Sequence, residues 1–396
     1  MFSQKISDLI NQVEKIGKLK PISQKELLFL LEKCIHGETL EIDEIIELIN
    51  STISYENKKL ILDFSINYKR PHDQEVLLLP PLYFSSICEN KCLYCDFSSS
   101  KGMRLSYDEF LNEFNALLDM GYRSIELVSS QDPGLYIKKS SDSDTQLYDI
   151  YKAAKYFDIA KKSLEEKGSG MLTSNIPPVD IQSFKKLKSV GLDCYLSWLE
   201  TFNTNQYPRL HYSNGPKADQ AFRLDSFDKA IEAGIEHIAG AFLKGLYNWR
   251  EEEAILYLFD KYLKTRNGRG FSIIGTPRLK GLIRKSKSVS SYLVSDEDYE
   301  LNIALDRILF DGILWLQTRE SFMFNNKLIT DYGGGVILTL TSCTSPGGYH
   351  KLSKEKAQFP VFKQNLHKSV NALENAGYKA IFNWNSQTLL DFQRRI

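Results

Sequence analysis

Three cysteines lie close together in the 396-residue chain: Cys88, Cys92 and Cys95, at C-x3-C-x2-C spacing. Three thiolates at this spacing can bind three irons of a [4Fe-4S] cube and leave the fourth iron open to a small molecule. A structural zinc site would need a fourth Cys or His nearby, and the closest histidine, His72, precedes the motif, so zinc is the weaker interpretation. A disulfide is weaker still, because no secretory segment is visible and the other cysteines are scattered singly.

With Tyr94 directly before its third cysteine, the motif resembles that of the radical S-adenosylmethionine (SAM) superfamily. The resemblance implies that the open iron chelates the amino and carboxylate groups of SAM. One electron from the cluster would then split SAM into methionine and a 5'-deoxyadenosyl radical, with Tyr94 against the adenine. The alternative of another class is a non-catalytic barrel in which the cysteines only brace a loop around iron–sulfur or zinc.

The elements that must position this motif alternate along the chain. Apolar runs at 76–79 and 82–87 predict a buried strand that ends at the cysteines. Further strands are predicted over 124–128, 171–175, 194–199, 238–243, 271–275, 313–316 and 336–341, and helices over 107–120, 147–167, 180–190, 219–233, 251–264 and 296–310. Eight strands, most separated by helices, predict an α/β fold of the TIM-type, a (β/α)8 barrel with right-handed crossovers.

Segments at both ends complete the predicted organisation. Residues 1–75 read as an N-terminal helical extension that plugs or buttresses the barrel, and 76–396 as the radical SAM barrel. A helix over 362–376 and a strand-like stretch over 378–384 are expected to close or cover it. Lys plus Arg equals Asp plus Glu, 50 against 50, so no net field recruits nucleic acid or an acidic membrane. With no long apolar segment or signal peptide, the expected location is the cytoplasm.

Polar residues follow the predicted strands, at the end of a barrel where chemistry takes place. Together they resemble one branch of the superfamily, the aromatic amino acid lyases, from Pro80 nearly to the C-terminus. The matching landmarks, besides the cysteines, are Pro81-Leu82-Tyr83, Glu200-Thr201, Gly215-Pro216-Lys217 with Arg223, Trp249-Arg250, Pro277-Arg278, Thr318-Arg319-Glu320-Ser321 and Pro346-Gly347-Gly348-Tyr349. Several motifs in one order are far more specific than the cysteines alone.

Two of these positions, together with Gln131, are candidates for binding SAM. Glu200 can accept from the ammonium or ribose, and Arg223 can pair with the carboxylate, unless the two lie on the surface. Gln131 stands where the family's tyrosine lyases have glutamate, as Ser130-Gln131 replaces Gly-Glu. A neutral amide loses the charge-assisted part of that contact, so the SAM contact there is expected either to weaken or to be taken over by Asp132.

The substrate candidates are Tyr83, Arg319, Thr339 and Ser342. A guanidinium matches a planar carboxylate, so Arg319 is expected to hold that of an amino acid; the alternative is an ion pair to Glu320 or Asp331. Tyr83 is expected near the cluster, orienting the amino group or ring, or else packed in the core. Tyr83 and Arg319 are also the two predicted catalytic residues.

The resemblance implies a lyase whose deoxyadenosyl radical takes hydrogen from the amino group of an aromatic L-amino acid. Tyrosine would give dehydroglycine and 4-cresol; tryptophan would give 3-methyl-2-indolic acid; a related enzyme would make another product. The C-terminal cysteine cluster of the hydrogenase-maturation branch is missing, since only Cys343 follows Cys194. Expected partners are an electron donor such as flavodoxin or ferredoxin and an enzyme that accepts the labile product.

Overall fold

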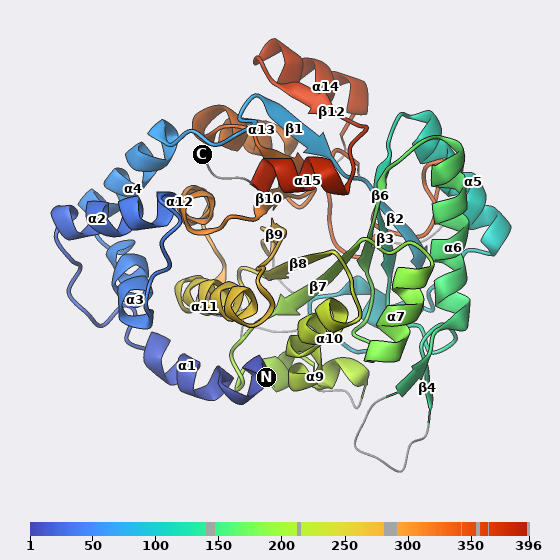
Figure 1. Ribbon diagram of the computed structural model, residues 1–396, viewed down its shortest axis with the longest axis horizontal. Helices are drawn as coiled ribbons and strands as arrows, with labels where there is room; N and C mark the ends of the chain where they lie inside the picture. The colour runs from blue at the N-terminus through green and yellow to red at the C-terminus, as the bar shows by residue number, and fades with distance from the viewer. Residues whose placement is uncertain are drawn as a thin grey trace.

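A computed structural model of the protein describes residues 1–139, 147–211, 215–280, 291–341, 343–353, 357–362 and 364–393. Ten parallel strands curl into a barrel at its centre (Figure 1). Their order in the sheet is β12 (Lys379–Ile381), β1 (Glu75–Leu78), β11 (Val336–Leu338), β10 (Ile313–Leu316), β9 (Ile273–Gly275), β8 (His237–Phe242), β7 (Cys194–Glu200), β6 (Met171–Asn175), β3 (Ser124–Ser129) and β2 (Pro81–Ser85).

The barrel closes because β1 and β2 are two halves of one interrupted strand. β1 pairs with β11 and β2 pairs with β3, and the break falls at Leu79 and Pro80. The amide of Leu79 still donates to Leu338, while the carbonyl of Pro80 accepts from Glu126. Counting these halves as one strand gives the eight predicted strands, and β12 adds a further one beside β1 at the base. The predicted α/β barrel is confirmed, and β12 lies in the stretch expected to close it.

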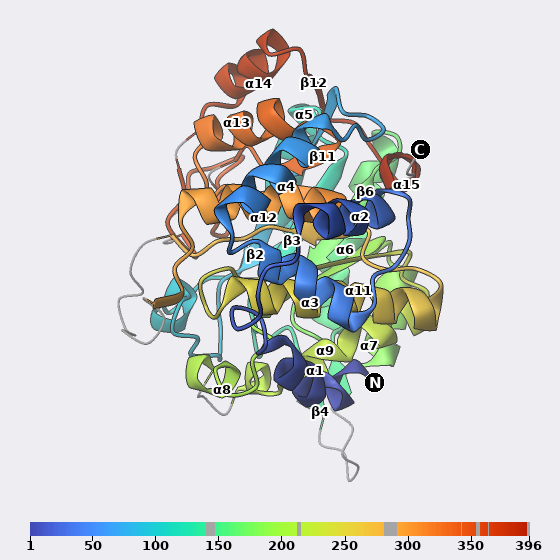
Figure 2. The same ribbon diagram turned by 90° about the vertical axis from the view of Figure 1, so that its left-hand side faces the viewer.

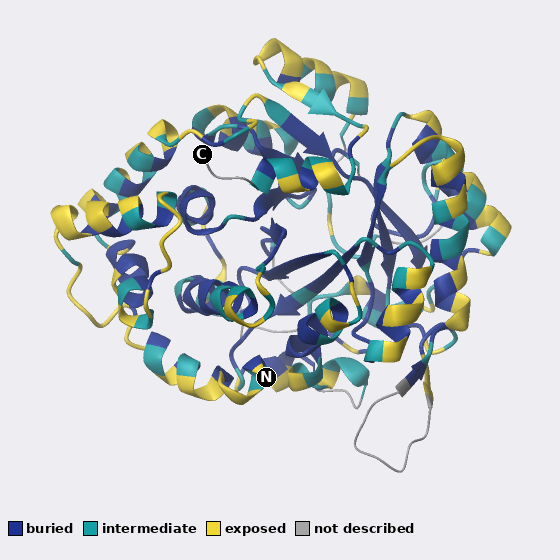
Figure 3. Ribbon diagram, viewed as in Figure 1, coloured by how far each residue is buried: buried dark blue, intermediate teal, exposed yellow. Residues whose placement is uncertain are grey.

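Helices surround the sheet. Their bounds are α1 (Ile6–Val13), α2 (Gln24–Ile35), α3 (Ile42–Ser51), α4 (Tyr55–Asn67), α5 (Tyr107–Asp119), α6 (Tyr151–Glu166), α7 (Ile181–Ser189), α8 (Tyr207–Leu210), α9 (Gln220–Leu224), α10 (Ser226–Glu232), α11 (Trp249–Asn267), α12 (Asp296–Leu309), α13 (Phe322–Tyr332), α14 (Leu366–Asn375) and α15 (Ser386–Gln393). Figure 3 shows the strands buried and the outward helix faces exposed. No helix in the described ranges is long and apolar enough to cross a bilayer.

The structure differs from the prediction at three helical segments. The segment at 147–167 begins with β5 (Leu147–Asp149), which forms an antiparallel hairpin with β4 (Ile137–Lys139), so its helix starts only at Tyr151. The segment at 219–233 is two helices, α9 and α10, separated at Asp225. Helix α13 was not predicted, although Ser321 caps it by accepting from the amide of Phe324.

The N-terminal helices form an outer layer. Helices α1 and α3 pack on α11, while α2 and α4 pack on α12, and Figure 2 shows this layer from its own side. The base of the barrel is covered instead by the C-terminal segment. Leu389 and Phe392 of α15 join the apolar core inside the barrel, and Trp384 Nε1 donates to the carbonyl of Leu78 at 2.9 Å. The candidate active site therefore lies at the opposite end of the barrel.

Candidate active site

The three cysteines line one hollow above the end of β2. This cysteine pocket is walled by Cys88, Cys92, Cys95, Gln131 and Arg223, among other residues. Burial raises the pKa of Cys92, and burial together with the neighbouring Cys92 and Cys88 thiols raises that of Cys95 to about 12. The crowded thiols of Cys92 and Cys95 are poor thiolates on their own, and iron supplies the positive charge that makes such a set favourable. The donor set thus fits a [4Fe-4S] cluster.

Two buried polar atoms of the cysteine pocket have no hydrogen-bond partner among the described residues: Nε2 of Gln131 and Nε of Arg223. Arg223 points inward from α9, and its Nη1 donates to Ser197 Oγ at 3.0 Å and to the carbonyl of Trp198 at 3.1 Å. Buried donors are normally paired, so unused donors indicate a ligand with acceptor groups. The carboxylate of SAM has the required chemistry.

Asp132, the residue that was the alternative to Gln131 for the SAM contact, already has its carboxylate engaged. Its buried carboxylate accepts from Arg104, from Ser85 Oγ at 2.6 Å and from the amide of Gly134 at 2.9 Å. Within the described residues, the hydrogen bonds of this carboxylate are thus directed into the scaffold beside β2. Of the two side chains, it is the neutral amide of Gln131 that lines the cysteine pocket.

Glu200 closes the wall between the cysteine pocket and a second hollow. It ends β7 after a bulge, with φ of 67°, a left-handed conformation that is unusual for a residue with a side chain. Its carboxylate accepts from Lys217 Nζ at 2.5 Å. Burial opposes the charge of Lys217, but Glu200 and then Cys92 outweigh that effect and raise the pKa of the amine. Glu200 is therefore held as an inward-facing, paired carboxylate.

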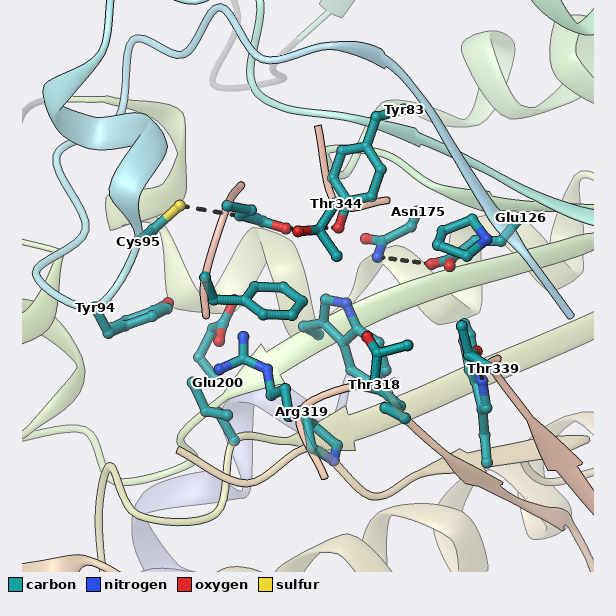
Figure 4. Close-up of a pocket in the computed structure, with 18 of the residues that line it drawn as sticks. Tyr83, Tyr94, Cys95, Glu126, Asn175, Glu200, Thr318, Arg319, Thr339 and Thr344 are labelled. Carbon is teal, nitrogen blue, oxygen red and sulfur yellow. Dashed lines mark hydrogen bonds between the residues drawn. The ribbon is translucent and has the colours of Figure 1, made fainter. Parts of the chain in front are cut away.

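The second hollow, here called the inner chamber, lies deeper in the barrel. It is lined by Tyr83, Glu200, Arg319, Thr339 and fifteen further residues, and shares Cys95 with the cysteine pocket. Figure 4 shows the labelled side chains from Cys95 on one side to Glu126 on the other. A molecule in the inner chamber would therefore lie next to one in the cysteine pocket.

A hydrogen-bonded chain joins the two hollows. Tyr83 Oη donates to Gln358 Oε1 at 2.8 Å, and Gln358 Nε2 donates to Cys95 Sγ at 3.7 Å. Burial raises the pKa of Tyr83 far above its usual value, so the phenol stays neutral. The ring also contacts Phe97 edge to face, at 6.1 Å between centroids. Tyr83 thus stands beside the motif, where the sequence placed it.

Arg319 faces the inner chamber without a carboxylate partner in the part of the chain that the structure describes. Glu320 pairs with Arg278 and Lys280, and Asp331 pairs with Lys327, so both alternative partners are occupied. The guanidinium stacks on the ring of Phe359 at 3.7 Å, and its Nε is buried without a hydrogen bond. Burial lowers its pKa. An anion entering the chamber would relieve this unpaired charge.

The remaining predicted residues differ in whether they have a polar group that is free to bind a ligand. Tyr94 lines the inner chamber, with its hydroxyl bonded to His211 Nε2 at 2.7 Å. Thr339 also lines it, but its hydroxyl already donates to Leu79 and accepts from Trp315, so it has little left for a substrate. Ser342 lies outside the described residues. Thr344, which was not predicted, presents a buried hydroxyl without a partner in the described chain.

Sequence reasoning missed other wall residues. Lys217 stands within the Gly215-Pro216-Lys217 landmark, so its motif was a usable signal. Gln358 and Phe359 come from a C-terminal stretch without any pattern, and Asn175 is the last residue of β6. Glu126 sits inside the apolar run of β3, where a charged residue between hydrophobic neighbours was the signal to question.

Comparisons with known proteins agree with this geometry. Residues 82–259 match the model of the radical SAM superfamily. Over 339 residues the chain is 27% identical to the 2-iminoacetate synthase of Escherichia coli (strain K12), covering 83% of each chain. The crystal structure of HydG, a maturase of the [FeFe]-hydrogenase, matches with a TM-score of 0.81 and 24% identity over 98% of this chain and 84% of that one.

HydG from Carboxydothermus hydrogenoformans matches with a TM-score of 0.78 and 25% identity, over 100% of this chain and 85% of that one. The fold, the family model and the full-length likeness all point to the same superfamily, which uses a [4Fe-4S] cluster and SAM. Residues 82–259 are therefore identified as a radical SAM domain, and the chain as a whole is similar to the 2-iminoacetate synthases and to HydG.

Proposed function

We propose that this enzyme is a lyase that fragments an aromatic L-amino acid, and that its substrate is L-tyrosine, cleaved to dehydroglycine and 4-cresol. The observation that carries the proposal is Arg319, a buried guanidinium in the inner chamber with no carboxylate partner among the described residues. The relative named 2-iminoacetate synthase supports the same product, because dehydroglycine and 2-iminoacetate are one compound.

When bound, the cluster and SAM supply a 5'-deoxyadenosyl radical by one-electron cleavage of SAM. The substrate's amino group loses a hydrogen atom, and the Cα–Cβ bond breaks. One fragment is dehydroglycine. The other, a 4-hydroxybenzyl radical, gains one electron from an external reductant and one proton to become 4-cresol. We expect a flavodoxin or ferredoxin to supply the electrons and another enzyme to accept the unstable imine.

The chain's own residues position the reactants. Arg319 holds the substrate carboxylate by two parallel hydrogen bonds, which fixes the amino group toward the shared wall at Cys95. Tyr83, which donates to Gln358 and stays neutral, orients the substrate without adding charge. On the other side of the wall, Arg223 and Gln131 offer unused donors to the carboxylate of SAM.

The test is an anaerobic incubation of the reconstituted enzyme with SAM, a reductant and one amino acid at a time. With tyrosine we expect 4-cresol, glyoxylate from hydrolysis of dehydroglycine, and 5'-deoxyadenosine in a matching amount. Cys92→Ala should abolish SAM cleavage altogether. Formation of the indolic acid from tryptophan would mean that tryptophan, and not tyrosine, is the substrate. Formation of 5'-deoxyadenosine without any fragment of either amino acid would refute the proposed lyase activity.

A further inference from the structure

Glu126 is an acidic residue on the inner face of the barrel. It lies on β3 two residues before Val128, in register with Pro81 of β2 and Thr173 of β6. Its neighbours Ile125 and Leu127 point to the outer core, while Glu126 lines the inner chamber. The interior beneath it is apolar, formed by residues such as Leu77, Leu79, Met171, Cys194 and Leu196. Burying a carboxyl group in such an apolar interior costs free energy unless the group makes hydrogen bonds or an ion pair.

One neighbour engages Glu126. Asn175 Nδ2 donates to its Oε1 at 2.9 Å, and the described residues provide neither an ion pair nor a partner for Oε2. Burial raises the pKa of Glu126 to about 8, and no nearby cation opposes that effect. The group is therefore a largely neutral carboxyl at pH 7, held by Asn175 and able to accept or donate one more hydrogen bond.

The inner chamber gives this carboxyl a defined place relative to the substrate. In Figure 4, Glu126 lies on the side of the chamber away from Cys95, with Arg319 between them. Trp198 and Trp315, whose rings contact each other at 5.8 Å between centroids, form one apolar side of the chamber. The indole Nε1 of Trp315 is already used by Thr339, so this ring offers only its surface. The chamber thus combines a guanidinium, an aromatic surface on which a substrate ring can lie and a carboxyl group.

We propose that Glu126, held by Asn175, determines specificity by recognising the phenolic hydroxyl of an aromatic amino acid whose carboxylate is held by Arg319. This inference rests on the proposed function, and it adds that the enzyme recognises the hydroxyl group on the substrate's ring. The phenol can donate to the carboxyl or accept from it. Phenylalanine would bury the same ring and leave Glu126 Oε2 without a partner. Such an unsatisfied group costs about 1–3 kcal/mol, or roughly 5- to 150-fold in affinity.

The test is the binding of L-tyrosine and L-phenylalanine to the cluster-containing enzyme with SAM and no reductant, measured by anaerobic equilibrium dialysis. Wild-type protein should bind tyrosine at least about 10-fold more tightly. Glu126→Leu should bring the two dissociation constants within about 3-fold, mainly by weakening tyrosine, and Glu126→Gln should retain part of the preference. Thr173→Val is the matched control, since Thr173 shares the register of Glu126 but does not line the chamber, and it should leave the ratio unchanged.

The inference is overturned if Glu126→Leu and Glu126→Gln both keep the wild-type ratio, or if wild-type enzyme binds phenylalanine as tightly as tyrosine. It is also overturned if 4-aminomethyl-L-phenylalanine, a cation of similar length, binds more tightly than tyrosine, because Glu126 would then be an ammonium site. Tyrosine that is bound with the expected selectivity but yields no 4-cresol contradicts the lyase and leaves the recognition by Glu126 standing. Tyrosine that is neither bound nor cleaved removes both proposals.

Discussion

At the scale of single residues, substrate capture depends most directly on Arg319. Its guanidinium has a flat partner in Phe359 and no anionic partner in the described chain. Arg319→Ala should lower kcat/KM for tyrosine by about 100-fold or more, because it removes two charge-assisted hydrogen bonds. Arg319→Lys should retain only part of the wild-type kcat/KM, because the lysine ammonium is a point charge and cannot make both hydrogen bonds to the substrate carboxylate. The measurement is tyrosine-dependent formation of 5'-deoxyadenosine and 4-cresol.

The control for this prediction is Arg250→Ala. Arg250 pairs with Asp298 and with Thr52 of the N-terminal layer, far from the chamber lining, so its loss should leave kcat/KM near the wild-type value. Iron and sulfide content and SAM binding should be unchanged in both arginine variants. If Arg319→Ala keeps full turnover, the inner chamber is not where the substrate binds.

The sequence predicted residues that belong to ordered motifs and missed those that reach the site through tertiary structure. Arg319 and Glu200 were found because each follows a strand within a recognisable motif. Gln358 was not, because the segment around it carries no periodic pattern and reaches Tyr83 only in the folded chain. Asp132 shows the opposite error: it was near the expected place in sequence, but Arg104 and Ser85 occupy its carboxylate.

At the scale of elements, helix α5 anchors the loop that covers the chamber. Glu113 accepts from the amides of Tyr349, His350 and Lys351 at 2.6, 2.8 and 3.1 Å, respectively. Glu113→Gln would set an amide NH2 against these donors and lose part of the charge-assisted bonding. We expect faster amide hydrogen exchange at residues 343–353 and a several-fold lower kcat, with the cluster intact.

Asp108→Asn is the matched control, because Asp108 is an exposed residue at the other end of the same helix. It should change neither the exchange rate nor kcat. Unchanged exchange in Glu113→Gln would mean that the loop is held by other contacts, such as the hydrogen bond from Tyr349 Oη to the carbonyl of Pro81.

Elements with strong periodicity were predictable, and elements defined by their packing were not. Strands β6 and β10 match the predicted bounds, because each begins with apolar residues directly after a turn that contains glycine. Helix α13 begins Phe-Met-Phe-Asn-Asn, a stretch of mostly weak helix formers, and depends on its packing against α12 and α4. Helix α15 is short, and its two buried residues acquire their role only at the base of the finished barrel.

At the scale of the whole molecule, the two ends of the barrel have separate tasks. The end that carries the cysteines holds both hollows, while Trp384 and α15 seal the other end. This division was predictable from the rule that barrel chemistry lies at the carboxyl ends of strands. The positions of the buried acids were not predictable, because only the closed fold determines whether an acid such as Glu126 or Glu252 lies inside the molecule.

These buried acids make the stability of the molecule depend on pH. Burial raises the pKa of Glu126 and that of Glu252 to about 8, whereas an unfolded glutamate titrates near about 4.3. Between these values the folded state binds more protons than the unfolded state, so the free energy of unfolding falls as pH rises toward and through about 8. Buried His211 and His237 have lowered pKa values, so their opposite effect is confined below about pH 7.

The melting temperature of wild-type protein should therefore fall between pH 7 and pH 9. Glu126→Gln removes one of the two ionisations and keeps an acceptor for Asn175, so its melting temperature should fall less over the same interval and exceed that of wild type at pH 9. Glu26→Gln is the control: this exposed glutamate has a lowered pKa, so it is ionised in both states above pH 7 and its loss cannot alter the slope. Differential scanning calorimetry at matched iron content measures all three proteins. If the melting temperature of Glu126→Gln changes with pH as steeply as that of wild type, the barrel interior does not destabilise the ionised form of Glu126. The burial of Glu126 would then carry no cost for a bound substrate to relieve.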